Sequence, residues 1–317
     1  EYLRRLLGSP VAAARLIELG QFDALFALAD KATDRASRVV LLGAFYANDR
    51  LVQRLVEQKR VEPMLQFLQQ DADAGVRRQV LQRLGYNPTA LQAIAGIGQV
   101  ETLLTLCRQE QEKYVRGSLL GALLASPHVV QYFIDRKQTD KFFEWLRSEP
   151  DAAVRRQILQ NVAMRSEVLV PLIAQGRFED LLAILQQDAE PSMRGYLLAS
   201  VVTRPEVIQR LAADKRLDAV IQLARAQEPP AARRQFLQRL CSSPACLGPL
   251  LEQGFFEALL EIAGSDPEPA ARAATIGQLV ANPKTVEHLV AGGKVGLLLE
   301  LASKQDTVEA RRAFLAP

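Results

Sequence analysis

The chain has 317 residues, of which 49% are hydrophobic, 24% charged and 6% aromatic, so it can bury a large core and is not disordered by composition. Its 39 basic and 36 acidic residues give a formal net charge of +3, which is too balanced to indicate nucleic acid or an anionic membrane as a partner. No apolar run approaches the roughly 18 residues that cross a bilayer and no signal-peptide pattern begins the chain, so we expect a soluble protein without membrane insertion, and its arginine-rich, lysine-poor usage suggests a bacterial source.

A short motif returns along the chain at a constant interval. A hydrophobic residue followed by arginine begins at positions 76, 115, 154, 193, 232, 271 and 310, a constant step of 39 residues, and Ser37-Arg38 lies in the same register. We therefore treat residues 1–317 as a single repeat domain with partial repeats at both ends. The partial repeats are 1–36 and 310–317, and the complete repeats are 37–75, 76–114, 115–153, 154–192, 193–231, 232–270 and 271–309.

Each repeat contains three apolar segments with helical spacing. In the repeat 154–192, apolar residues recur every three or four positions within 154–162, 168–173 and 178–185. Proline at the first helical position, often behind a capping side chain, marks the start of the second helix. These pairs are Asn87-Pro88, Ser126-Pro127, Arg204-Pro205, Ser243-Pro244 and Asn282-Pro283. No segment alternates as a strand does, so we predict an all-α fold.

Two further columns mark the third helix. Glycines suited to a left-handed helix C-terminus precede it at Gly20, Gly98, Gly176, Gly254 and Gly293. Acidic residues follow in its first turn, where negative charge complements the helix dipole. They are Asp23, Glu62, Glu101, Asp140, Glu179, Asp218 and Glu257.

A second period of 78 residues lies on top of the first. Arg78, Arg156, Arg234 and Arg312 alternate with Val39, Gly117, Gly195 and Ala273, and Gln82, Gln160 and Gln238 alternate with Gly43, Gly121, Ala199 and Gly277. Lys59, Lys137 and Lys215 alternate with the glycines before the third helix. Two interpretations stay open: duplication of a two-repeat module, and interlocking of large and small residues on adjacent first helices.

The repeat junctions, at 71–77, 149–155 and 266–272, place an acid, often a proline, another acid and then an arginine in order. This pattern resembles the HEAT-repeat signature, and the division by a mid-repeat proline is similar to the armadillo variant. The resemblance implies a right-handed α-solenoid of three-helix repeats, in which these arginines and acids form structural ladders. The implied ladder residues are Arg38, Arg77, Arg116, Arg155, Arg194, Arg233 and Arg272 with Asp71, Glu110, Glu149, Asp188 and Asp266. Ala32, Gln227 and Gln305 break the acidic column.

The residues that usually carry catalysis are scattered. His128 and His288 lie four repeats apart, and Cys107, Cys241 and Cys246 stand in apolar columns without metal-ligand or disulfide spacing. We therefore expect no enzymatic activity, no cofactor and no metal. Cysteines of this kind are typical of a reducing compartment, which favours the cytoplasm.

The residues of the third helices outside the core columns form one stripe, which the resemblance places on the concave side of the solenoid. We call this the third-helix stripe; it comprises Gln66, Gln69, Thr105, Arg108, Lys141, Glu144, Arg147, Asp180, Gln186, Gln222, Arg225 and Glu261. Its middle is basic around Arg108, Lys141 and Arg147, and its C-terminal part is acidic at Glu257, Glu261 and Glu300. A solvated face of mixed charge is the alternative interpretation.

The hypothesis that follows is a non-enzymatic scaffold that binds a protein or peptide partner along this stripe. The armadillo mode of binding basic peptides is not expected, because the Asn and Trp ladders are missing and Trp145 stands in an apolar column with Phe67 and Leu106. A HEAT-like protein that binds nucleic acid, as some DNA glycosylases do, is an alternative, although the acidic C-terminal part and the lack of stacking aromatics on the stripe argue against it. A HEAT-type lyase is a weaker one, since no catalytic cluster is visible.

Neither end of the repeat array carries a polar cap. Core columns continue to both termini, at Tyr2, Leu3, Leu6, Phe314 and Leu315. Because each repeat buries its apolar face only against its neighbours, we expect the chain to be a piece of a longer repeat protein or to have its ends covered.

Overall fold

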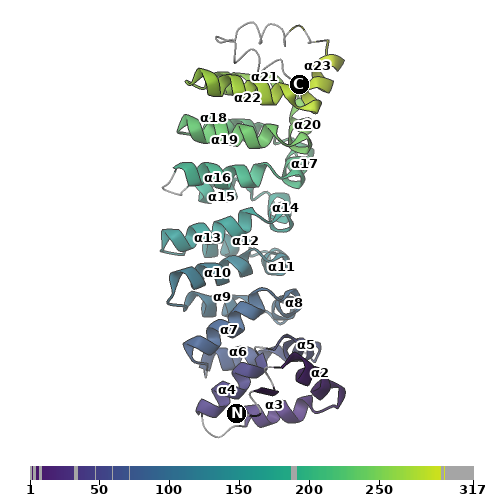
Figure 1. Ribbon diagram of the computed structural model, residues 1–317, viewed down its shortest axis with the longest axis vertical. Coiled ribbons are helices and arrows are strands. Elements are labelled where there is room, and N and C mark those ends of the chain that lie inside the picture. Colours follow the sequence, from purple (N-terminus) through teal and green to yellow (C-terminus); the bar gives the residue numbers. More distant parts are fainter. Residues whose placement is uncertain are drawn as a thin grey trace. The chain divides into compact units, whose positions relative to one another are not determined.

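The computed structural model describes residues 9–31, 35–46, 48–58, 60–70, 72–186 and 191–293, together with residues 2, 5, 6 and 296. These residues form 22 helices, α2 to α23, and no strand (Figure 1). The prediction of an all-α chain is confirmed. The partial repeat predicted at 310–317 lies outside the described residues, as do Lys59, Leu3, Phe314 and Leu315. The chain divides into two compact units, Glu1–Val162 and Ala163–Pro317.

The first unit contains the helices up to α12 and nearly all of α13, with three helices in each complete repeat. The first helices are α4 (Arg35–Tyr46), α7 (Ala74–Gly85), α10 (Lys113–Leu124) and α13 (Ala152–Ala163). The second helices are α2 (Pro10–Glu18), α5 (Asp49–Glu57), α8 (Pro88–Gly96) and α11 (Pro127–Asp135). The third helices are α3 (Phe22–Asp30), α6 (Val61–Gln70), α9 (Val100–Arg108) and α12 (Thr139–Arg147).

The second unit repeats the same order of helices. The first helices are α16 (Pro191–Val202), α19 (Pro230–Cys241) and α22 (Pro269–Ala281). The second helices are α14 (Ser166–Ala174), α17 (Pro205–Ala213), α20 (Pro244–Glu252) and α23 (Pro283–Ala291). The third helices are α15 (Phe178–Gln186), α18 (Asp218–Arg225) and α21 (Phe256–Gly264).

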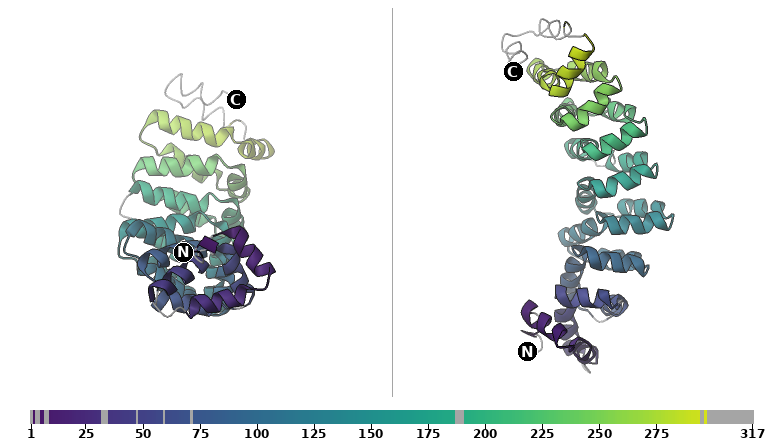
Figure 2. Two further views of the ribbon diagram at one scale, coloured as in Figure 1. Left: turned by 60° about the horizontal axis from the view of Figure 1, so that its bottom comes forward. Right: turned by 90° about the vertical axis from the view of Figure 1, so that its right-hand side faces the viewer.

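Within each unit, a helix packs against the helix that holds the same place in the neighbouring repeat (Figures 1 and 2). In the first unit, α4 contacts α7, α5 contacts α8 and α6 contacts α9. In the second unit, α16 contacts α19, α17 contacts α20 and α18 contacts α21. Each repeat therefore buries its apolar columns largely against the next repeat, as a chain of identical-length modules requires.

The local signals in the sequence specify where these helices begin and end. The five prolines predicted to begin second helices occupy the first turn of α8, α11, α17, α20 and α23. The five predicted glycines have φ between 64° and 83°. In the alternate repeats, Lys137 and Lys215 adopt the same left-handed turn, with φ of 55° and 56°. The turn is thus kept where the glycine is absent, at a backbone cost of about 1–2 kcal/mol per residue.

Small residues on the first helices receive side chains from the next repeat. A Cβ atom at Gly117 would lie 2.3 Å from Gln157 Oε1, and one at Gly121 would lie 2.5 Å from Asn161 Nδ2. A Cβ atom at Gly43 would lie 2.7 Å from Cγ1 of Val76, which begins the next repeat. The first helices of neighbouring repeats therefore lie too close at these three positions for a larger residue to fit without a shift.

The core is aliphatic with local aromatic clusters. Phe45 lies between Phe22 and Phe26, with ring centroids 5.3 and 5.4 Å away, at the N-terminal part of the first unit. Cys107, Cys241 and Cys246 are buried as free thiols, which matches their apolar columns.

Among the described residues, no single helix has both the length and the apolar character to cross a membrane. Two pairs of consecutive helices, α8 with α9 and α10 with α11, have the required length and apolar character only when both helices of the pair are counted. The chain bends by 119° between α8 and α9 and by 60° between α10 and α11.

Candidate interaction surface

The third-helix stripe lies at the surface of the first unit. Gln66, Gln69, Thr105, Glu144 and Arg147 are exposed. Arg108 and Lys141 are half-buried, because each reaches to the third helix of a neighbouring repeat. The row is therefore connected from α9 to α12 by side-chain contacts that the repeat pattern does not reveal.

The middle of this row is less basic than its composition indicates. Lys141 Nζ lies 3.0 Å from Glu101 Oε1, an acid of the helix-dipole column one repeat earlier. Both side chains are about two-fifths exposed, at 45% and 39%, so the pair contributes only about 0–1 kcal/mol to stability while removing the net charge of the lysine. Of the predicted basic residues, Lys141 therefore adds little net positive charge to the stripe.

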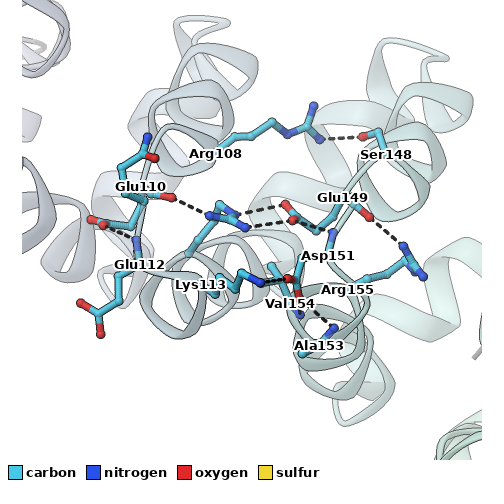
Figure 3. A network of polar contacts seen from close by, with 12 residues as sticks. Arg108, Glu110, Glu112, Lys113, Ser148, Glu149, Asp151, Ala153, Val154 and Arg155 are labelled. Carbon is cyan, nitrogen blue, oxygen red and sulfur yellow. Dashed lines mark hydrogen bonds and ion pairs between the residues drawn. The ribbon is translucent and has the colours of Figure 1, made fainter. Parts of the chain in front are cut away.

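Two residues position Arg108, namely Trp145 on α12 and Ser148 at the C-cap of α12. Its Nη2 donates to Ser148 Oγ at 2.6 Å, as Figure 3 shows, and its guanidinium carbon lies 3.9 Å from the centroid of the Trp145 ring. Burial lowers the pKa of Arg108, and the charge of Glu149 opposes this shift. A positioned, partly desolvated cation thus faces the stripe.

Trp145 is more exposed than the other described residues of its apolar column. The matching side chains Phe67, Leu106 and Ile184 are no more than 2% exposed, whereas Trp145 is only half-buried. An indole is larger than these side chains and does not fit entirely into the space between two repeats. The stripe therefore has an aromatic residue that the sequence reasoning missed; the only signal for it was a Trp in a column of smaller residues.

In the second unit, the stripe residues form ion pairs of their own. Asp180 on α15 pairs with Arg177 at 2.7 Å, and Arg225 on α18 pairs with Glu261 on α21 at 2.7 Å. Gln186, Gln222, Arg225 and Glu261 are exposed, and Asp180 is half-buried.

The junction arginines bind backbone carbonyls of the loop before their own helix. Arg116 Nη1 donates to the Glu110 carbonyl at 2.8 Å, Arg155 to the Glu149 carbonyl at 2.7 Å (Figure 3), and Arg272 to the Asp266 carbonyl at 3.1 Å. Each arginine therefore meets the acid six residues before it through the backbone of that residue and not through its carboxylate.

The other ladder arginines lie at matching positions. Arg77 donates to the carbonyls of Leu68 and Ala72, at 3.0 and 2.9 Å. Arg38, Arg194 and Arg233 are half-buried. Asp71 and Asp188 lie outside the described residues.

The junction carboxylates bind arginines from the first helix of the same repeat, 32 or 33 residues earlier in the chain. Arg78 holds Glu110 through Nε and Nη2 at 3.1 and 2.9 Å, and Arg234 holds Asp266 in the same way at 3.0 and 3.1 Å. Where the column has Gly117 instead, Arg116 turns to Glu149 at 3.2 Å, and that carboxylate is only 1% exposed. The alternation of arginine and small residues therefore also decides which guanidinium reaches the next junction.

These contacts shift the acidity of the junction carboxylates. The hydrogen bond from Arg78 is the main cause that lowers the pKa of Glu110. Burial by itself would raise the pKa of Asp266, but the hydrogen bonds from Arg234 and the Glu268 backbone N–H outweigh it and leave the pKa low. The ladder is thus a set of ionised carboxylates that stabilise the junctions between repeats.

The candidate catalytic residues do not gather into a site. His128 and His288 are half-buried, the latter with its ring 6.0 Å from that of Phe256. Within the described ranges, no three His, Cys, Asp or Glu side chains lie together as metal ligands would. Burial raises the pKa of the Cys241 thiol to about 12 and that of Cys107 further, so these thiols stay protonated near neutral pH.

A hollow of about 550 Å³ lies on the first helices, between α10 and α13. It is lined by Lys113, Tyr114, Ala153, Val154, Arg156, Gln157 and Gln160. Lys113 Nζ pairs with Asp151 at 2.6 Å, so its charge is already balanced.

Comparison with known proteins assigns this chain to no family. No protein-family model matches this chain, and no curated protein sequence matches it. Among solved structures, an engineered protein from the Northeast Structural Genomics Consortium matches with a TM-score of 0.44 and 17% identity, over 98% of this chain and 81% of that chain. The chain is an all-α protein whose 39-residue sequence repeat corresponds, throughout the described residues, to successive groups of three helices.

Proposed function

We propose that this chain is a right-handed α-solenoid of the HEAT/armadillo type that works as a non-enzymatic scaffold and binds a protein or peptide partner along its third-helix stripe. The observation that carries the proposal is that each third helix has a buried apolar face and an exposed polar face. Their apolar columns, such as Leu103, Leu106 and Cys107 on α9, are buried, while Thr105 on the same helix is exposed. Within each unit, a row of such helices offers an extended polar surface, which is how stacked repeats bind partners.

A binding comparison on matched variants tests the proposal. The stripe variant carries Arg108→Glu, Lys141→Glu and Arg147→Glu, and the control variant carries Arg50→Glu, Arg136→Glu and Lys137→Glu. All three control residues are exposed on or beside second helices of the same unit. Both variants change the net charge by the same amount, so non-specific electrostatic effects are matched.

Each form is used to capture proteins from the native source, with quantification by mass spectrometry. We expect a set of proteins retained by the wild type and the control variant and lost by the stripe variant, with similar circular dichroism and melting temperature in all three. Equal retention by the stripe variant contradicts the proposal. If the material that is lost is nucleic acid, removed by nuclease and steeply salt-dependent, the nucleic-acid alternative replaces it.

A further inference from the structure

One repeat places an aromatic residue on the stripe where the others do not. The other residues of this column are apolar, and those whose burial the structure describes are buried, with Leu223 and Ile262 each 4% exposed in the second unit. Trp145 is the single tryptophan of the chain. Because every repeat needs this column only for its core, the exposed part of the indole contributes nothing that the repeat architecture requires.

The guanidinium that covers Trp145 forms no ion pair with any carboxylate of the described residues. Arg108 contacts the indole face and Ser148 Oγ, both of them neutral groups. The charge of Glu149 acts on Arg108, but that carboxylate is bound by Arg116, and burial destabilises the charged form of Arg108. A partly desolvated cation of this kind gains from an incoming anion more than a fully hydrated one does.

The second unit shows what occupies the matching place elsewhere in the chain. Arg225 stands in the same column as Arg108, and it binds the carboxylate of Glu261 at 2.7 Å. Glu144 stands in the column of Glu261, yet Arg108 turns to Trp145 and Ser148 instead of to Glu144. The position therefore suits a carboxylate, and in the first unit the chain does not supply one.

We propose that Arg108 and Trp145 form the anchor of the stripe and take a carboxylate side chain of an acidic peptide segment in the partner. This inference rests on the proposed function. The carboxylate accepts hydrogen bonds from the guanidinium while its methylene groups pack on the exposed part of the indole. Tryptophan and arginine are also the residue types most enriched among binding hot spots.

A peptide fits this surface better than a nucleic acid strand does. Glu101 and Glu144 lie on the same two helices, and a continuous phosphate backbone would pass close to them. On the described part of the stripe the indole of Trp145 is the one exposed ring, and Arg108 already covers its face, so successive bases find no stacking platform there.

Because Trp145 is the only tryptophan, its fluorescence reports on the site directly. An aspartate- and glutamate-rich peptide without aromatic residues is titrated into the full chain at low salt, next to a lysine-rich peptide and a single-stranded oligonucleotide of equal length. We expect a saturable change of emission with the acidic peptide alone. Arg108→Gln should weaken that binding by at least about tenfold, since it removes a charge-assisted contact.

The chain offers a close control for this variant. Arg136 also covers an aromatic ring, with its guanidinium carbon 4.0 Å from the centroid of Tyr132, but it lies beside a second helix. Arg136→Gln removes the same charge and should leave the affinity unchanged. Glu144→Gln should tighten binding, because it removes a carboxylate near the incoming anion. Calorimetry on Trp145→Leu, which restores the residue type of the column, should show weaker binding in a folded chain.

Three results would overturn the proposal: no saturable signal with the acidic peptide, equal weakening by Arg108→Gln and Arg136→Gln, or tighter Arg108-dependent binding of the oligonucleotide. These results are distinguishable from failure of the scaffold function. A partner that depends on the stripe in the capture experiment but tolerates Arg108→Gln refutes the anchor and leaves the proposed function standing.

Discussion

Gly43 tests whether the first helices of neighbouring repeats interlock as described. In the middle of α4, a glycine-to-alanine change normally stabilises a helix by about 0.5–1 kcal/mol. Here the added Cβ would lie 2.7 Å from Val76 Cγ1 and 3.2 Å from Val76 Cγ2 on α7. Overpacking of this kind costs about 1–3 kcal/mol, so we expect Gly43→Ala to leave the stability unchanged or to lower it by up to about 2 kcal/mol.

Removing the opposing methyl groups should reverse the sign. The added Cβ would lie 3.6 Å from Val76 Cβ, an ordinary contact, so Gly43→Ala should be stabilising by about 0.5–1 kcal/mol when it is made in Val76→Ala. The coupling energy from this double-mutant cycle should therefore be about 1–3 kcal/mol. Urea unfolding followed by circular dichroism measures all four free energies.

A glycine-to-alanine change at Gly85, the last residue of α7, serves as a control. A Cβ at Gly85 would have its nearest neighbour, Ala122 Cβ, at 3.6 Å, so Gly85→Ala should not destabilise the chain. If Gly43→Ala is stabilising by the same amount in both backgrounds, the coupling is zero and the close approach of α4 to α7 is wrong.

Two further predictions concern backbone strain and pH. Lys137→Gly and Lys215→Gly should each raise the free energy of unfolding by up to about 1 kcal/mol, because glycine adopts a φ near 55° without steric cost. Gly98→Ala should lower the free energy of unfolding, because alanine at a φ of 79° is strained. Urea denaturation measures these changes, and a loss of stability in the lysine variants would contradict the prediction. The pKa values of Glu110 and Asp266 are lowered in the folded chain, so their contribution to stability is complete above the unfolded-state pKa values near 4 and is lost as the pH falls through the lower folded-state values. The free energy of unfolding measured from pH 7 to pH 2 should show this loss. The double variant Glu110→Gln, Asp266→Asn should flatten the dependence of stability on pH.

The third-helix stripe could be predicted only in part. The exposure of Gln66, Thr105 and Glu144 follows from the helical period, since residues outside the apolar columns of an amphipathic helix face water. Their contacts do not follow from it. The sequence predicts that Lys141 belongs to a basic region of the stripe, whereas the structure places its ammonium group against the carboxylate of Glu101. The period assigns a residue to a face, but the direction of a long side chain on that face depends on the neighbouring repeat.

The ladder of junction arginines and carboxylates could likewise be predicted only in part. That the junction arginines serve the loops could be expected from their place in each repeat, and Arg155 does bind the carbonyl of Glu149. Sequence spacing draws attention to the acid six residues away, whereas the carboxylates of Glu110 and Asp266 bind arginines 32 residues earlier, Arg78 and Arg234. Arg78 also pairs with Glu112, and Arg234 with Glu268, so each guanidinium reaches more than one carboxylate, and the packing of the three helices within the repeat decides which ones.

The amino-acid order by itself determined the 39-residue period, the three helices of each repeat and the left-handed turns at five glycines. These features depend on interactions between residues fewer than five positions apart, such as capping, proline geometry and the allowed φ of glycine. The tertiary structure decided that Trp145 is partly exposed and that Arg108 covers it. Whether an indole fits between two repeats is a question of the space that the surrounding side chains leave, and this space exists only once the repeats have stacked.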